Sequence, residues 1–200
     1  CGQTGCDVFA ESLVAGTASV NDCPVGGNAL VEKLAEILGV KAEKTDTKTA
    51  RVLCRGSNKE CRQKFNYMGI DDCAAASGLY GGPSACSYGC LGLGNCVKAC
   101  PFNAIVINDG LARVIQSRCT ACGKCVSACP KGIIDIIPES NNYTVSCSSH
   151  DRGNIVRKNC SVGCIGCRRC AKVCPANAIS FEGALAKIDP KVCTNCGACK

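Results

Sequence analysis

Four closely spaced cysteines constrain this chain more than any other feature. They form a C-x2-C-x2-C-x3-C-P run made by Cys119, Cys122, Cys125 and Cys129. This spacing places three thiolates around one [4Fe–4S] cluster and sends the fourth to a second cluster nearby. Gly123 lets the backbone approach inorganic sulfide, and Pro130, which lacks an N–H, is expected to end the short helix that carries Cys129. The run therefore predicts an iron–sulfur protein.

Two other uses of cysteine fit the sequence less well. A zinc-stabilised interaction module needs four ligands, usually as two separated C-x2-C pairs. Disulfides are typical of secreted chains, and the sequence shows no signal peptide and places its cysteines too close together for neighbours to pair. Cysteine supplies 23 of 200 residues and tryptophan none, so bound clusters are expected to replace part of an ordinary core.

An internal repeat with a constant offset of 74 residues begins at Cys73. It pairs Cys73 with Cys147, Cys86 with Cys160, Cys90 with Cys164, Cys96 with Cys170, Cys100 with Cys174, and Cys119, Cys122 and Cys125 with Cys193, Cys196 and Cys199. Each copy has the cysteine pattern of a two-cluster ferredoxin. Turn residues inside each copy predict two hairpins, 104–107 with 111–115 and 178–181 with 185–188.

Two departures from the repeat affect the ligand sets. Leu93 stands where the second copy has Cys167, and we expect Cys86 to supply the missing ligand, which leaves its counterpart Cys160 spare. The counterpart of Cys129 would fall beyond residue 200. We therefore expect the last unit to be cut short, and we likewise expect a cysteine just upstream of Cys1.

We expect about six [4Fe–4S] clusters. Five sets follow from spacing: Cys86, Cys90, Cys96 and Cys129; Cys100, Cys119, Cys122 and Cys125; Cys164, Cys167 and Cys170 with one ligand missing; Cys174, Cys193, Cys196 and Cys199; and Cys1, Cys6 and Cys23 with one ligand missing. A sixth set is drawn from Cys54, Cys61, Cys73, Cys147 and Cys160.

The charge and the remaining motifs exclude several functions. The formal charge is +7, but six oxidised clusters with their thiolates would bring it to about −5, and no aromatic platform accompanies the lysines, so we expect no nucleic-acid partner. His150 is the only histidine, and no nucleotide motif or catalytic constellation is present. We therefore expect a chain that carries electrons and has no catalytic residue of its own.

Several motifs together resemble one protein family. They are Cys1-Gly-Gln-Thr-Gly-Cys6, Cys23-Pro-Val-Gly-Gly27, Gly69-Ile-Asp-Asp-Cys73, Gly81-Gly-Pro83, Cys86-Ser-Tyr-Gly-Cys90-Leu-Gly-Leu-Gly94 and Asn159-Cys-Ser-Val-Gly-Cys164-Ile-Gly-Cys167. They are similar to the B subunits of Rnf complexes, the membrane-bound ferredoxin:NAD⁺ oxidoreductases. The resemblance implies an electron-transfer subunit that accepts electrons from reduced ferredoxin. It would pass them to membrane and flavin-carrying subunits, where electron flow drives Na⁺ or H⁺ translocation.

The resemblance also implies a location and a domain order. We expect the chain at the cytoplasmic face of the membrane, peripheral or anchored by a segment absent here, and an α+β fold with a small N-terminal iron–sulfur (Fes-type) domain before tandem ferredoxin-like units. The expected divisions are 1–48 (with helices at 7–15 and 28–40 and a linker at 41–48), 49–85, 86–139 and 140–200. The alternative is that the chain is the electron-transfer subunit of another redox complex, such as a hydrogenase or a formate dehydrogenase.

Overall fold

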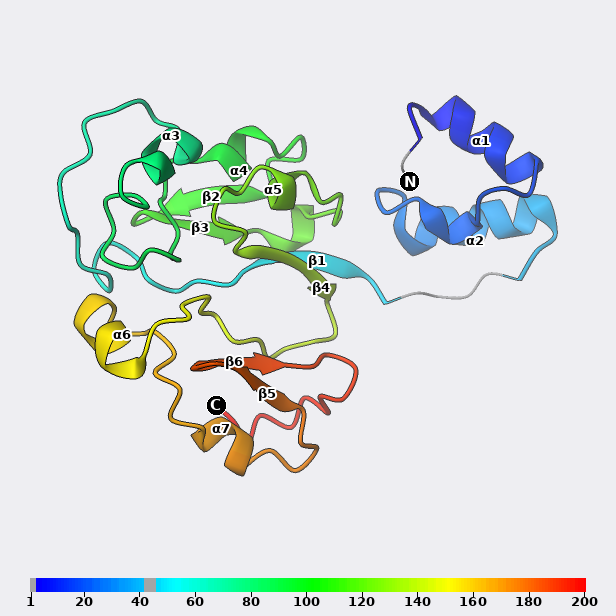
Figure 1. Cartoon of the computed structure of the whole chain (residues 1–200). Coiled ribbons are helices and arrows are strands. Elements are labelled where there is room, and N and C mark those ends of the chain that lie inside the picture. Colours follow the sequence, from blue (N-terminus) through cyan, green and yellow to red (C-terminus); the bar gives the residue numbers. More distant parts are fainter. Residues whose placement is uncertain (1–2, 42–45) are drawn as a thin grey trace.

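The computed structural model describes residues 3–41 and 46–200. The expected ligand Cys1 and part of the expected linker lie outside these residues. Three parts follow one another along the chain: a pair of helices, a central unit, and a second copy of that unit at the C-terminal end (Figure 1). None of the described helices is long and apolar enough to cross a bilayer.

The N-terminal part is helical, as its spacing of apolar residues predicts. Helix α1 (Cys6–Val14) buries Phe9 and is joined through a 3₁₀ turn (Val20–Asp22) to α2 (Gly27–Leu38). Gly39 ends α2 in the left-handed region at φ 66°, where glycine has no steric penalty. Both expected helices are thus confirmed.

The central unit has two small antiparallel sheets with short helices around them. Strand β1 (Lys48–Val52) pairs with β4 (Ile134–Pro138), and β2 (Ile105–Asn108) forms a hairpin with β3 (Leu111–Val114). The helices are α3 (Cys73–Gly78), α4 (Asn95–Lys98), a 3₁₀ turn (Gln116–Arg118) and α5 (Lys124–Ser127). Helix α5 ends before Cys129, so Pro130 is not the residue that ends it, contrary to our expectation.

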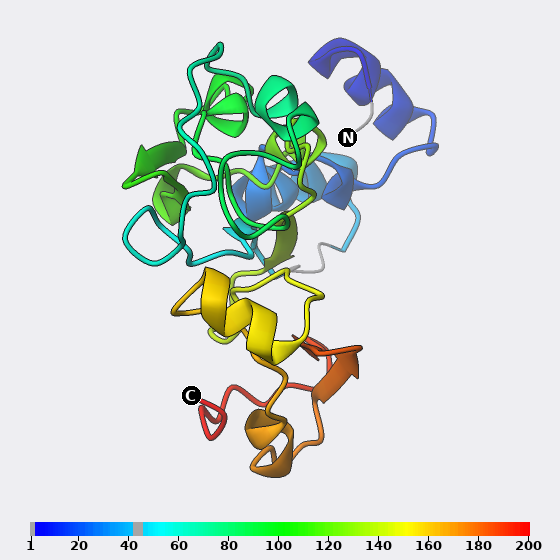
Figure 2. The same cartoon turned by 60° about the vertical axis from the view of Figure 1, so that its left-hand side comes forward.

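The second copy repeats the hairpin and the helix before it, whereas α6 (Gly153–Asn159) has no helical counterpart in the first copy. Helix α6 precedes α7 (Arg169–Lys172), and β5 (Ile179–Glu182) pairs with β6 (Leu185–Ile188). The hairpins of the two copies share one register, since Ile105 faces Val114 and Ile179 faces Ile188. Both predicted hairpins are therefore confirmed. Figure 2 shows α6 on the side of the second copy that faces the central unit.

One close backbone approach recurs in both copies. A Cβ atom at Gly92 would collide with the carbonyl oxygen of Gly110, and one at Gly166 would lie 2.7 Å from that of Ala184. These residues are related by the offset of 74. Gly92 and Gly166 both have positive φ. Glycine is therefore required at these two positions for both its backbone conformation and its lack of a side chain.

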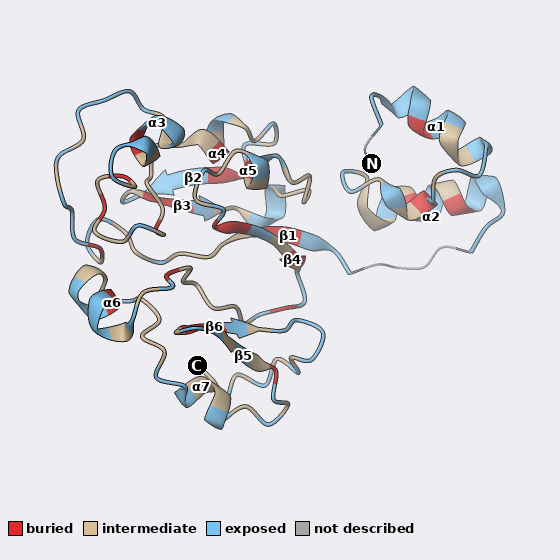
Figure 3. Cartoon of the chain, in the orientation of Figure 1, coloured by how far each residue is buried: buried red, intermediate tan, exposed pale blue. Residues whose placement is uncertain are grey.

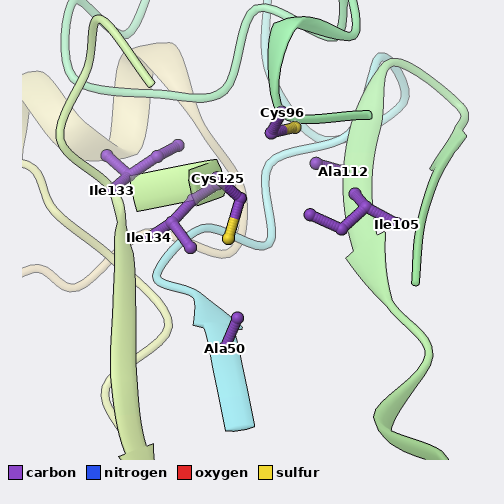
Figure 4. Packing of buried hydrophobic residues seen from close by; sticks show 7 residues of the cluster. All are labelled: Ala50, Cys96, Ile105, Ala112, Cys125, Ile133 and Ile134. Carbon is purple, nitrogen blue, oxygen red and sulfur yellow. The ribbon is translucent and has the colours of Figure 1, made fainter. Parts of the chain in front are cut away.

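The core of the central unit includes cysteines that face cavities. Cys96 of α4 and Cys125 of α5 lie among small and aliphatic side chains, which are Ala50, Ile105, Ala112, Ile133 and Ile134 (Figure 4). Most of the loops around this core are exposed or half-buried (Figure 3). The burial of apolar side chains is thus concentrated around the sheets and the short helices beside them.

The sheet made by β1 and β4 is the main element that the sequence did not predict. Strand β1 begins in the stretch expected to be a polar linker, and its pattern of buried Thr49 and Ala50 gives little apolar signal. It pairs with the isoleucine-rich β4, which supplies most of the apolar surface. The segment 49–85 is thereby held against the first ferredoxin-like unit, and the four expected divisions remain a prediction.

Candidate iron–sulfur sites

The first cavity, cavity A, lies between α4 and the chain that follows α5. Four cysteines line it: Cys73, Cys90, Cys96 and Cys129. Three of them were expected together, but the fourth was expected to be Cys86, which the structure places in a different cavity. The structure instead brings Cys73, which begins α3, into this cavity.

A short polar network holds Cys73 in this position. Asp72 caps α3 by accepting the N–H of Ala75 at 2.8 Å, and its other oxygen accepts the side-chain amide of Asn95 at 2.8 Å. These two hydrogen bonds lower the pKa of the Asp72 carboxyl. Asn95 in turn lies next to Cys96 at the start of α4, so the network ties two of the cysteines of cavity A together.

The second cavity, cavity B, contains the set expected from the C-P run. It is lined by Cys100, Cys119, Cys122 and Cys125. The N–H of Ala50 donates to the Cys119 sulfur at 3.3 Å and that of Ala104 to the Cys100 sulfur at 3.4 Å. The second copy repeats the latter contact, since the N–H of Ala178 donates to Cys174 at 3.4 Å.

The third cavity, cavity C, lies where the two copies meet. It is lined by five cysteines: Cys54, Cys61, Cys86, Cys147 and Cys160. Cys61 and Cys160 face each other in an isolated antiparallel bridge, flanked by backbone hydrogen bonds from Arg62 to Asn159 and from Ser161 to Glu60, both 2.9 Å. Cys160 was expected to be spare, but the structure places it directly opposite Cys61 in this cavity.

The repeat explains why the two copies use their extra cysteines differently. In the first copy Cys73 fills the gap that Leu93 leaves in cavity A. In the second copy Cys167 is present, and Cys147, the counterpart of Cys73, lines cavity C instead. The absence of one cysteine at position 93 was thus a signal in the sequence, although we took it to indicate Cys86 and not Cys73.

The remaining cysteines lie at the two ends of the chain. In the second copy, Cys164 and Cys167 lie close enough to Cys170 to affect its ionisation, and Cys193, Cys196 and Cys199 follow β6 in a turn-rich segment. Cys6 begins α1. Cys23 and Cys119 line the two sides of a cavity of about 590 Å³ between the N-terminal helices and the central unit.

Family models match three parts of the chain. Residues 79–130 and 163–200 each match a model described as a 4Fe-4S dicluster domain, and residues 1–25 match the FeS model, which is for an Fe-S cluster. The three matches occur in the order expected from the sequence. Cavities A and B take most of their cysteines from the first dicluster match, whereas Cys54, Cys61, Cys147 and Cys160 of cavity C lie outside all three.

Relatives that match along essentially the whole of this chain decide the family. The B subunit of an ion-translocating oxidoreductase complex from Methanosarcina acetivorans is 43% identical over all 200 residues, which cover 76% of its length. The chain belongs to this family of B subunits. The B subunit of the Na⁺-translocating ferredoxin:NAD⁺ oxidoreductase complex of Acetobacterium woodii is 44% identical over the whole chain and 60% of its own length. The proton-translocating counterpart of Clostridium ljungdahlii is 44% identical over 98% of the chain and 70% of its length.

Several cysteines of this member of the B-subunit family are buried or half-buried thiols. Burial raises the pKa of Cys96 to about 12 and that of Cys54 to about 11, and it also raises the pKa of Cys86, Cys90, Cys125, Cys160 and Cys170. Cys196 is exposed, and the backbone N–H of Ala198 lowers its pKa. Iron must therefore displace protons from most of these thiols as it binds.

The donor sets fit [4Fe–4S] clusters. Cavities A, B and C are each lined by at least four cysteines. Cysteine is the ligand that such clusters require. None of the 22 described cysteines forms a disulfide. Within residues 3–41 and 46–200, no three His, Cys, Asp or Glu side chains converge as the ligands of a single metal ion do. A bound [4Fe–4S] cluster supplies reversible one-electron chemistry, and the chain supplies its thiolates, N–H donors and burial.

Proposed function

We propose that this chain is the electron-transfer subunit of a ferredoxin:NAD⁺ oxidoreductase complex that couples electron flow to Na⁺ or H⁺ translocation. It accepts electrons from reduced ferredoxin and relays them between its iron–sulfur sites. The observation that carries the proposal is the succession of adjoining cysteine-lined cavities. The names of the full-length relatives support this complex over a hydrogenase or a formate dehydrogenase.

The order of the sites supports a relay. Cys23 of the N-terminal part and Cys119 of cavity B line one cavity. Cys125 of cavity B and Cys96 of cavity A belong to one packed cluster of buried residues. Cys54 of cavity C packs against that same cluster, and cavity C reaches the second copy through Cys147 and Cys160. These shared linings and packed side chains connect the N-terminal part to the second copy in a continuous series.

We propose about six [4Fe–4S] clusters. Four belong to the two ferredoxin-like units and one to the N-terminal part, where Cys1, Cys6 and Cys23 are the ligands within this chain. The sixth occupies cavity C with Cys61, Cys86, Cys147 and Cys160. The other sets are Cys73, Cys90, Cys96 and Cys129; Cys100, Cys119, Cys122 and Cys125; Cys164, Cys167 and Cys170; and Cys174, Cys193, Cys196 and Cys199.

The chain's own residues set the properties of each site. Backbone N–H groups aimed at sulfur, such as those of Ala50 and Ala104, favour additional negative charge on the sulfur atoms. Burial of Cys96 and Cys125, each 7% exposed, excludes water from cavities A and B. Lys131 places its ammonium group near Cys86 and Cys129, which belong to two different cavities. Hydrogen bonds to sulfur, burial and nearby charge are the factors by which a protein adjusts the reduction potential of a cluster.

The proposed partners follow from membership of the complex. The other membrane and flavin-carrying subunits receive the electrons, and reduced ferredoxin supplies them. The chain lies at the cytoplasmic face of the membrane, held there by its partners or by a further segment.

Anaerobic reconstitution of the full chain tests this function. We expect a brown protein with acid-labile sulfide in equal amount to iron, and electron paramagnetic resonance signals typical of reduced [4Fe–4S] clusters. A reduced two-[4Fe–4S] ferredoxin should bleach it in stopped-flow mixing. Zinc in place of iron, with no sulfide, would contradict the proposal, as would an iron-loaded chain that ferredoxin cannot reduce.

A further inference from the structure

Four large apolar side chains are exposed together on the chain before and after α3. Met68 is 87% exposed, Ile70 69%, Leu79 50% and Tyr80 88%. We call these four residues the outer-loop patch. The segment that leads into α3 runs along the outer edge of the molecule, and it is exposed along most of its length (Figure 3). The segments before and after α3 lie side by side, since the N–H of Lys64 donates to the carbonyl oxygen of Pro83 at 2.7 Å and Gln63 forms an antiparallel bridge with Ser84. Exposed apolar residues on such neighbouring segments mark an interaction site more often than single ones do.

The backbone at Tyr80 is held in an unfavourable conformation. Tyr80 has φ 51°, and Gly81 and Gly82 continue in the same region at 75° and 97°. Four of the other six described non-glycine residues with positive φ are Asn or Asp, which tolerate it, whereas a bulky aromatic residue does not. Such strain tends to persist where the position of a side chain matters for function.

Lysine side chains fix this conformation from both sides. The ammonium of Lys64 donates to the carbonyl oxygen of Tyr80 at 2.8 Å, and that of Lys131 donates to those of Gly81 and Ser87, both at 2.7 Å. The Tyr80 ring is nevertheless left in solvent. The surrounding structure therefore positions an aromatic side chain without burying it.

The patch lies directly outside cavity A. Cys73, which lines that cavity, begins α3, and Leu79 and Tyr80 follow its last residue. The ammonium of Lys98 donates to the backbone carbonyl oxygen of Asp71, just before α3, at 2.6 Å. A molecule seated on the patch would thus be separated from the cysteines of cavity A by little more than the short helix α3.

We propose that the outer-loop patch is the docking surface for an acidic, soluble one-electron carrier of the ferredoxin type, and that cavity A is its point of entry. The proposal rests on the function proposed above. Lys64, Lys98 and Lys131 hold their ammonium groups against the loops of the patch. They outnumber the carboxylates of Asp71 and Asp72 there, so the patch complements an acidic partner. A patch of only four side chains has the size of the small interfaces in transient redox encounters, and it is smaller than the interfaces between permanent subunits.

Replacing Tyr80 by glycine separates docking from folding. Glycine relieves the positive φ, so Tyr80→Gly should keep or raise the temperature at which the loaded chain loses its clusters, with iron and sulfide unchanged. The same change should raise the Kd for an oxidised two-[4Fe–4S] ferredoxin, measured by titration calorimetry, at least about fivefold, as truncation of an interface aromatic does. Met68→Ser should have the same direction of effect. Ile37→Ser on α2, where Ile37 is 78% exposed, is the matched control.

The outcomes distinguish this proposal from the function on which it rests. If ferredoxin reduces the wild-type chain but the Kd is the same in Tyr80→Gly, Met68→Ser and Ile37→Ser, the patch is not the docking surface and the function stands. If Tyr80→Gly and Met68→Ser leave ferredoxin binding intact but prevent assembly with the other subunits, the patch is a contact between subunits and the proposal is overturned. If ferredoxin does not reduce the wild-type chain, both proposals fail.

Discussion

The backbone N–H of Cys73 donates to the side-chain oxygen of Asn95 at 2.8 Å. The two residues are 22 positions apart, and their contact joins the start of α3 to the start of α4. Asn95 precedes Cys96, so one side chain aligns cysteines from two separate segments around cavity A. This contact holds Cys73 at the cavity for which the repeat lacks a cysteine at Leu93.

Loss of the Asn95 side chain should therefore empty one site. In Asn95→Ala the N–H of Cys73 and one oxygen of Asp72 both lose their partner, and a buried unpaired donor costs about 1–3 kcal/mol. We expect the reconstituted chain to hold about four fewer irons, measured by iron and sulfide analysis. Asn154→Ala, at an exposed position on α6, is the control and should load like the wild type. Equal loading of both variants would refute the role of Asn95.

Iron counts also test the membership of cavity C. We expect Cys86→Ser and Cys160→Ser each to lose about one cluster, because both belong to the proposed four-cysteine set. Cys54→Ala should keep its iron. The Cys54 sulfur accepts N–H groups of Cys90 and Gly56, and its nearest ionisable neighbours are Cys90 and Cys86, which belong to different cavities. An iron loss in Cys54→Ala together with full loading of Cys160→Ser would reverse this assignment.

Two glycines separate backbone strain from steric collision. Gly123 and Gly92 both have positive φ, but a Cβ at Gly123 meets nothing within 4 Å, whereas one at Gly92 meets the backbone of Gly110. Gly123→Ala should cost about 1 kcal/mol. Gly92→Ala should cost roughly 1–3 kcal/mol more, because backbone cannot move aside as a side chain can. The temperature at which the loaded chains lose their colour should rank wild type, Gly123→Ala and Gly92→Ala in falling order, and an equal loss in the two variants would contradict the collision.

The cluster-free chain should show a wide spread of thiol reactivity. Only the thiolate attacks iodoacetamide, and the pKa of Cys196 is lowered whereas burial raises that of Cys96 to about 12. As the pH rises from about 7 to about 9 in the presence of reductant, Cys196 should be alkylated first and Cys96 last. Mass spectrometry of quenched samples identifies the order. Uniform labelling of both residues at a pH of about 8 would show that these environments do not persist without metal.

The sequence by itself determined the local parts of this protein. The C-x2-C-x2-C triplets, the two hairpins and the helices α1 and α2 all depend on residues within a few positions of one another, so spacing and turn residues were sufficient to predict them. The offset of 74 residues likewise predicted that α4 and α7, and the two hairpins, would be copies.

Only the tertiary structure decided which distant cysteines line the same cavity. Cys73 reaches cavity A through Asn95, and Cys61 meets Cys160 through a bridge between segments 99 residues apart. The pairing of β1 with β4 brings the segment before Cys54 onto the first unit. Such contacts depend on how strands and loops pack after the chain has closed long loops, and no local spacing encodes them. The sequence therefore predicted the chemistry of the sites, whereas packing brought together the cysteines of cavities A and C.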